Sequence, residues 1–162
     1  MFQAIPALAP LLQRPNLMRE KILLIEDDPL DQYLIQEVLK RLHSPVDVQS
    51  VASGDEAQGF LARLMPYGPF PSVIFLDIKM PGMDGQKFYQ ALLQRRDPLC
   101  EHVLFVTGDV VAPRTQEFLN RHHLARVAKP FRMEELSGAV QRMLRRTKAM
   151  TAPRPNAKAK EA

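Results

Sequence analysis

The sequence predicts an α/β protein in which five parallel strands form a doubly wound sheet with five helices. Two observations lead to this prediction. Strand-like and helix-like segments alternate strictly along the chain; the segments 73–76 and 103–106 are fully apolar, and 21–25 is apolar after its first residue. Strands that are apolar on both faces are typical of a parallel sheet that helices cover on both sides.

Each element is predicted from its own local pattern. Residues 30–42 carry apolar side chains at helical spacing, and Glu56 follows Ser53 by three residues, as in a capping box at a helix start. Pro113 suits the first position of a helix. The predicted strands are 21–25, 46–51, 73–76, 103–106 and 126–128, and the predicted helices are 30–42, 53–64, 86–95, 113–120 and 133–144.

The length of 162 residues suits one domain with terminal extensions. We expect a flexible, proline-spaced extension at 1–17, a folded domain at 18–146 and a disordered basic tail at 147–162, with Met18 as an alternative start. No apolar run reaches the roughly 18–20 residues that cross a bilayer. The single cysteine, Cys100, excludes an intrachain disulfide and fits a cytoplasmic setting.

The net charge of +4 comes from the carboxyl-terminal end of the chain. Residues 145–162 carry a net charge of +5, whereas the other 144 residues carry −1. A nearly neutral body does not favour nucleic-acid binding. Weak, salt-sensitive binding through the tail remains an alternative, and a solvated tail without a function is the preferred interpretation.

Chemically active side chains follow four of the predicted strands. Glu26, Asp27 and Asp28 follow the first strand, and Asp77 follows the third; Thr107 and Lys129 end the fourth and the fifth. The carboxyl ends of parallel strands form one edge of the sheet, which is where such proteins bind ligands. Clustered carboxylates suit Mg²⁺, and a lysine beside a metal-bound carboxylate suits an incoming phosphoryl group.

Each of these features has a simpler interpretation when taken alone. An acidic pair after a strand is usually a solvated loop or a favourable charge at a helix N-terminus. A lone aspartate in such a place is often an N-cap, and a Thr-Gly pair is usually a turn. The functional interpretation rests on all of them occurring together, in this order, on alternating β–α units.

Four segments carry a resemblance to a known family. KILLIEDDP, VIFLDIKMPGMDG, LFVTGD and VAKPF resemble the segments of a response-regulator receiver domain of two-component signalling, and the likeness covers residues 18–146. The chain is also similar to receivers that accompany bacterial hybrid kinases. The resemblance implies a flavodoxin-like sheet with the strand order 2-1-3-4-5 and a cis peptide bond before Pro130.

The resemblance also implies a role for each matched residue. Asp77 is then the phosphoacceptor, and Glu26, Asp27, Asp77 and the backbone carbonyl of Lys79 hold Mg²⁺. The neighbouring Asp28 is the weakest ligand candidate of the three consecutive acids.

Two further residues are matched to the phosphoryl group itself. Lys129 pairs with the phosphoryl group, and Thr107 moves to donate a hydrogen bond to it. Three further residues near this site, Arg126, Lys79 and Asp109, bear on how it would behave. Most receivers have an aromatic residue where this chain has Arg126, so the usual threonine–aromatic switch is in question. Lys79 and Asp109 carry opposite charges that can pair across the mouth of the site and shield the acyl phosphate; the alternative is that both side chains simply point to solvent.

The implied function is that of a single-domain response regulator, a phosphorylated signalling switch rather than a turnover enzyme. Its implied partners are a sensor histidine kinase or a histidine phosphotransfer protein, and it would signal by protein contact or phosphorelay. A homodimer through the fourth and fifth helices remains open; a membrane partner is not expected.

Two other classes compete with this interpretation. One is a phosphorylation-independent interaction module with a receiver fold, which Arg126 keeps open. The other is an aspartate-nucleophile phosphatase, but such enzymes need a second aspartate where this chain has Lys79.

Overall fold

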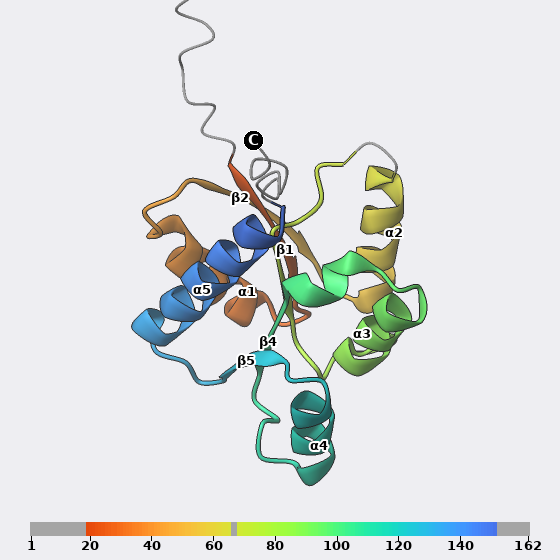
Figure 1. Cartoon of the computed structure of the whole chain (residues 1–162). Coiled ribbons are helices and arrows are strands. Elements are labelled where there is room, and N and C mark those ends of the chain that lie inside the picture. Colours follow the sequence, from red (N-terminus) through yellow and green to blue (C-terminus); the bar gives the residue numbers. More distant parts are fainter. Residues whose placement is uncertain (1–18, 66–67, 152–162) are drawn as a thin grey trace, which may run out of the picture.

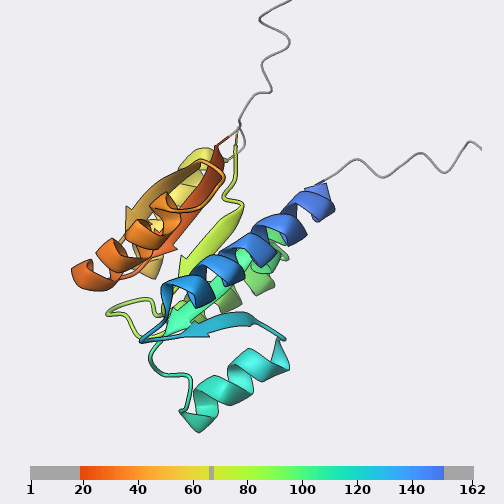
Figure 2. The same ribbon diagram turned by 90° about the vertical axis from the view of Figure 1, so that its left-hand side faces the viewer.

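The computed structural model describes residues 19–65 and 68–151. Five parallel strands form one sheet in the order β2-β1-β3-β4-β5, which confirms the predicted fold class and strand order. Helices cover both faces of this sheet (Figures 1 and 2). The strands are β1 Glu20–Ile25, β2 Val46–Val51, β3 Val73–Leu76, β4 Val103–Thr107 and β5 Ala125–Ala128.

The helices follow the strands in the predicted alternation. Pro113 opens α4, as expected. The structure adds a short 3-10 helix, η1, which Asp97 caps by accepting a hydrogen bond from the Leu99 N–H at 2.9 Å. The helices are α1 Pro29–Lys40, α2 Gly54–Leu64, α3 Gly85–Gln94, η1 Pro98–His102, α4 Pro113–Arg121 and α5 Met133–Thr151.

Alternate residues of the central strands point into two separate cores. On one face, Leu23, Ile74 and Phe105 pack against α2, α3, η1 and α4. On the other, Ile22, Phe75 and Leu104 pack against α1 and α5. All six side chains are almost completely buried, which explains why these strands read as apolar runs without alternation.

The start of α2 differs slightly from the predicted capping box. The Ser53 hydroxyl accepts a hydrogen bond from the Glu56 N–H at 3.2 Å, as expected. The Glu56 carboxylate instead accepts from the Ala52 N–H at 3.0 Å, one residue before the cap. The Ser53 hydroxyl thereby satisfies a backbone donor that the helix leaves free, and the Glu56 carboxylate satisfies the N–H of the residue before the cap.

The predicted start of the basic tail is wrong for its first five residues. Helix α5 continues to Thr151, seven residues past the predicted end, and Thr147 is buried. Lys148 Nζ lies 2.7 Å from Glu20 Oε1 at the start of β1, and Arg146 pairs with Glu101 of η1. These contacts bring the last turns of α5 into the folded domain, although their composition is that of a tail.

The predicted extension 1–17 and the remainder of the predicted tail, residues 152–162, lie outside the described residues. So do residues 66 and 67 of the proline-rich segment. Within the described ranges, no helix combines the length and the apolar character that a membrane span requires.

Candidate phosphoryl-acceptor site

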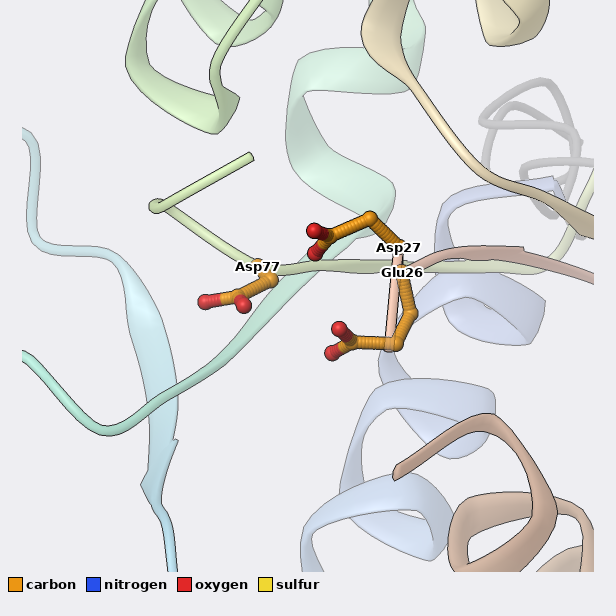
Figure 3. A group of neighbouring side chains, drawn as sticks. All are labelled: Glu26, Asp27 and Asp77. Carbon is orange, nitrogen blue, oxygen red and sulfur yellow. The ribbon is translucent and has the colours of Figure 1, made fainter. Parts of the chain in front are cut away.

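The parallel arrangement of β1 and β3 brings three carboxylates together at the carboxyl edge of the sheet. β1 ends at Ile25, which pairs with Leu76 at the end of β3. Glu26 and Asp27 follow the first of these strands and Asp77 follows the second, so their side chains lie side by side (Figure 3). One carboxylate oxygen from each lies within 4.8 Å of the others.

Two of the three carboxylates are buried, and the third is open to solvent. Glu26 is 1% exposed and Asp77 is 8% exposed, whereas Asp27 is more accessible. Burial raises the pKa of Glu26, and hydrogen bonds from Lys129 and the Asp28 N–H offset only part of this effect. Among the described residues, Asp77 Oδ1 is a buried oxygen without a hydrogen-bond partner.

This donor set fits a hard divalent cation. Three carboxylates from two strand ends supply oxygen ligands, and the open side at Asp27 leaves room for water. The buried, unsatisfied oxygen of Asp77 is itself an observation in favour of an ion, because such atoms are costly unless something binds them.

Lys129 reaches the cluster from the end of β5. Its ammonium lies 2.5 Å from Glu26 Oε2 and 3.2 Å from Asp77 Oδ2. Burial alone would lower the pKa of Lys129, but hydrogen bonds to Asp31 and Glu26 and the charge of Asp77 outweigh burial and raise it. Lys129 is therefore positively charged beside the Asp77 carboxylate. The bond from Lys129 to Pro130 is cis, as expected.

Asp31 is a contact of Lys129 that the sequence interpretation missed. It lies in the first turn of α1, and its Oδ2 accepts a hydrogen bond from Lys129 Nζ at 2.8 Å. An acidic residue in a first helical turn is usually explained by the helix dipole, so its spacing alone does not reveal this role.

Asp28 has a structural role in the described chain. Its carboxylate caps α1 by accepting hydrogen bonds from the Leu30 N–H at 2.8 Å and the Asp31 N–H at 3.2 Å. An oxygen that is committed to a helix cap is a poor metal ligand, which explains why Asp28 is outside the cluster.

Thr107 is buried at the end of β4, and its hydroxyl oxygen accepts a hydrogen bond from the Asp109 N–H at 3.3 Å. The expected pair is also present, with Lys79 Nζ 3.0 Å from Asp109 Oδ1. The other carboxylate oxygen of Asp109 accepts a hydrogen bond from the Thr115 hydroxyl of α4 at 2.9 Å. The Lys79 and Thr115 hydrogen bonds together lower the pKa of Asp109.

The loop that carries Asp77 is held by a close backbone contact. Asp84 caps α3 by accepting from the Lys87 N–H at 2.9 Å, and the Gly85 N–H donates to the Ile78 carbonyl at 3.0 Å. A Cβ atom on Gly85 would lie only 2.1 Å from the Asp77 carbonyl oxygen. The glycine is therefore required for α3 to lie this close to the loop that carries Asp77.

A separate cavity of about 730 Å³ lies at the opposite end of the sheet. It is lined by Glu20 at the start of β1, by parts of α2 and α3, and by the last turn of α5. None of the carboxylates near Asp77 lines it, so its size gives no reason to move the candidate site there.

Comparison with known proteins agrees with this geometry. The family model described as "Response regulator receiver domain" matches residues 22–141. The chain belongs to the response regulator receiver family. Aspartyl phosphate, phosphorelay and Mg²⁺ are typical of this family. This receiver has the family's fold, and Glu26, Asp27 and Asp77 cluster beside Lys129.

Several known proteins resemble this receiver over most of its length. It is 30% identical to sporulation initiation phosphotransferase F of Bacillus subtilis over 130 residues, which is 79% of this chain and 96% of the relative. The crystal structure of the receiver domain of a putative Luxo repressor protein from Vibrio parahaemolyticus has a TM-score of 0.69 and 25% identity, covering 82% of this chain and 95% of that one.

A metal-bound structure is among the similar ones. The Mn²⁺-bound form of response regulator Rcp1 has a TM-score of 0.63 and 26% identity, covering 84% of this chain and 99% of that one. Rcp1 is from Synechocystis. Other relatives are longer: the chain spans 47% of an uncharacterized response regulatory protein of Vibrio cholerae, to which it is 29% identical and which covers 80% of this chain.

Proposed function

We propose that this receiver accepts a phosphoryl group on Asp77 from the phosphohistidine of a sensor histidine kinase or a histidine phosphotransfer protein. One observation carries the proposal: Asp77 presents a buried oxygen without a hydrogen-bond partner in the described residues, while Lys129 holds its other oxygen. A carboxylate in this state is oriented and partly free, as a nucleophile must be.

The chemistry is a direct transfer between two side chains. A carboxylate oxygen of Asp77 attacks the phosphorus, and a P–O bond forms as the P–N bond to the donor imidazole breaks. The released imidazole nitrogen takes up a proton from solvent. Lys129 is placed to neutralise charge on the phosphoryl oxygens, which is the main task of a protein in such transfers.

Metal binding belongs to the same proposal. Glu26, Asp27 and Asp77, with the Lys79 backbone carbonyl, would hold Mg²⁺, which supplies further positive charge to the phosphoryl oxygens. Glu26 and Asp27 would thereby relieve their own mutual repulsion. In the absence of a cation, part of that repulsion is offset by Lys129.

Phosphorylation would be read through Thr107 and passed on by protein contact. The Thr107 hydroxyl can leave the Asp109 N–H and donate to the phosphoryl group. The likeness to a protein named as a phosphotransferase favours onward transfer to a histidine carrier. A cytoplasmic location and, as an open alternative, pairing of two copies through α4 and α5 complete the proposal.

Arg126 favours a second candidate function. Its guanidinium donates a hydrogen bond to Asn120 Oδ1 of α4 at 2.8 Å on the exposed surface. An arginine held in this way is unsuited to the inward movement that couples phosphorylation to the output face in typical receivers. The alternative is therefore an interaction module that binds its partner regardless of phosphorylation.

Intact-mass measurement after incubation with acetyl phosphate and Mg²⁺ tests the two functions against each other. The wild type should gain a single phosphoryl mass that is absent when EDTA is present from the start, and Asp77→Asn should gain none. Asp28→Asn, which alters a neighbouring acid outside the cluster, should gain the adduct like the wild type. A wild type that stays unmodified would contradict phosphoryl transfer and favour the interaction module.

A further inference from the structure

All three N–H donors of the Lys129 ammonium are directed at carboxylates. Its Nζ lies 2.5 Å from Glu26 Oε2, 2.8 Å from Asp31 Oδ2 and 3.2 Å from Asp77 Oδ2. An ammonium group has three donors and no acceptor, so this arrangement uses its full capacity. The contact with Asp77 is the longest of the three, which places Lys129 closer to the two acids that are not the acceptor.

Asp31 differs from the other two partners of Lys129. Its side chain comes from the first turn of α1 rather than from a strand end, and it lies outside the metal-suited cluster of the described residues. Its side chain, taken without the backbone, is also 29% exposed, compared with 2% for the side chain of Glu26 and 10% for that of Asp77. Water can replace Lys129 as the partner of a partly exposed carboxylate. Breaking the hydrogen bond from Lys129 to Asp31 therefore costs the least free energy of the three.

A phosphoryl group on Asp77 requires one of these bonds to change. The group brings anionic oxygens that accept strong hydrogen bonds, and Lys129 has no spare donor to give them. Glu26 is buried and would be left without its partner if Lys129 moved away from it. Of the two acids besides Asp77 that hold Lys129, Asp31 is therefore the one whose donor can turn to the phosphoryl group.

This inference rests on the proposed function. We propose that Asp31 is a positioning residue: it accepts a hydrogen bond from Lys129 in the unphosphorylated protein, and this bond breaks when Lys129 donates to the phosphoryl group instead. Its carboxylate then opposes phosphorylation in two ways: it competes for the lysine, and its charge repels the incoming anion. Asp31 thus sets how strongly the site binds a phosphoryl group without touching that group itself.

Binding of beryllofluoride, which mimics the phosphoryl group on a carboxylate, measures this effect. The full-length chain at saturating Mg²⁺ is titrated with beryllofluoride and followed by ¹⁹F NMR. Asp31→Asn should bind about two- to tenfold more tightly than the wild type, as expected for the loss of one competing, partly exposed ion pair. Asp31→Glu keeps the charge and should return the affinity toward the wild-type value.

A matched control and a metal-free measurement separate positioning from a merely structural effect. Glu37→Gln removes a carboxylate from the same helix, where it pairs with Lys40 instead, and should leave beryllofluoride binding unchanged. Without metal, a double-mutant cycle of Asp31→Asn and Lys129→Met, measured on the free energy of unfolding in urea, should show a favourable interaction between the two side chains. Absence of that interaction would overturn the proposal that Asp31 positions Lys129.

The outcomes also distinguish this inference from the proposed function. If the wild type binds beryllofluoride and Asp31→Asn binds it equally or more weakly, only the exchange at Lys129 is overturned. If the wild type neither binds beryllofluoride nor takes up a phosphoryl group from acetyl phosphate, the proposed function is overturned and the exchange with it.

Discussion

Lys79 Nζ lies 3.0 Å from Asp109 Oδ1, and this ion pair joins the loop after β3 to the loop after β4. Lys79 follows Asp77, the proposed acceptor, by two residues, and Asp109 follows Thr107 by two residues. The pair therefore crosses the mouth of the candidate site. Asp109 also accepts from Thr115, which connects this mouth to α4.

Removing this pair should shorten the lifetime of the acyl phosphate. With Lys79→Ala, water reaches the phosphoryl group more readily, and hydrolysis of phosphorylated protein should be several-fold faster than in the wild type. Loss of the adduct over time, followed by intact mass after removal of the donor, measures this rate. Lys87→Ala, at an exposed lysine of α3, is the control and should hydrolyse like the wild type. An unchanged rate for Lys79→Ala would refute the shielding role.

The surface hydrogen bond of Arg126 should keep the structural change that follows phosphorylation close to the site and away from β5. Amide shifts with and without beryllofluoride should change mainly around Asp77, Thr107 and Asp109, and little along β5. Arg126→Tyr, which supplies an aromatic side chain and breaks the bond to Asn120, should extend the changes into β5. Large wild-type shifts throughout β5 and α4 would show that coupling does not need the aromatic residue.

Gly85 should tolerate no side chain. Gly85→Ala places a Cβ 2.1 Å from the Asp77 carbonyl oxygen, so the loop that carries Asp77 or α3 must move. The expected loss is at least about 1–3 kcal/mol of unfolding free energy, measured by urea denaturation. Gly59→Ala is the matched control on α2, where the nearest atom to the new Cβ is 3.6 Å away. That change should stabilise the helix by about 0.5–1 kcal/mol; equal effects at both glycines would contradict the tight contact.

The last turns of α5 should contribute stability that depends on pH. Burial would raise the pKa of Glu20, but hydrogen bonds from Lys148 and Ser72 outweigh it and lower the pKa. A lowered folded-state pKa means that the contribution is present above the unfolded-state value of about 4.3 and is lost as the pH falls through the folded-state value.

Urea titrations between neutral and acidic pH test this contribution. At pH 7, Glu20→Gln should lower the unfolding free energy by at most about 1 kcal/mol, and Lys148→Gln should lower it similarly because it removes the partner. The curves of Glu20→Gln and the wild type should converge as the pH falls below about 4. A difference that persists unchanged into acid would contradict an ionic origin.

The strands and the clustering of the candidate site residues could be predicted because their patterns are local. The apolar run at 73–76 is β3 itself, and Asp77 after it lies at the carboxyl edge of the sheet with Glu26 and Asp27. The length of α5 could not be predicted in this way, because Thr147 and Lys148 are stabilised by contacts with residues distant in sequence, including Glu20. The contact between Asp31 and Lys129 could not be predicted for the same reason, because the two residues are 98 positions apart in the sequence.

The measurement that tests the central claim most directly is to locate the phosphoryl group on the chain. An aspartyl phosphate is an acyl phosphate, so borohydride reduces it to homoserine, and peptide mapping then identifies the modified residue. The account predicts homoserine at position 77 alone after treatment with acetyl phosphate and Mg²⁺, and none in Asp77→Asn. Homoserine at Asp27 or at any other aspartate would contradict the account, and so would the absence of homoserine from the whole chain.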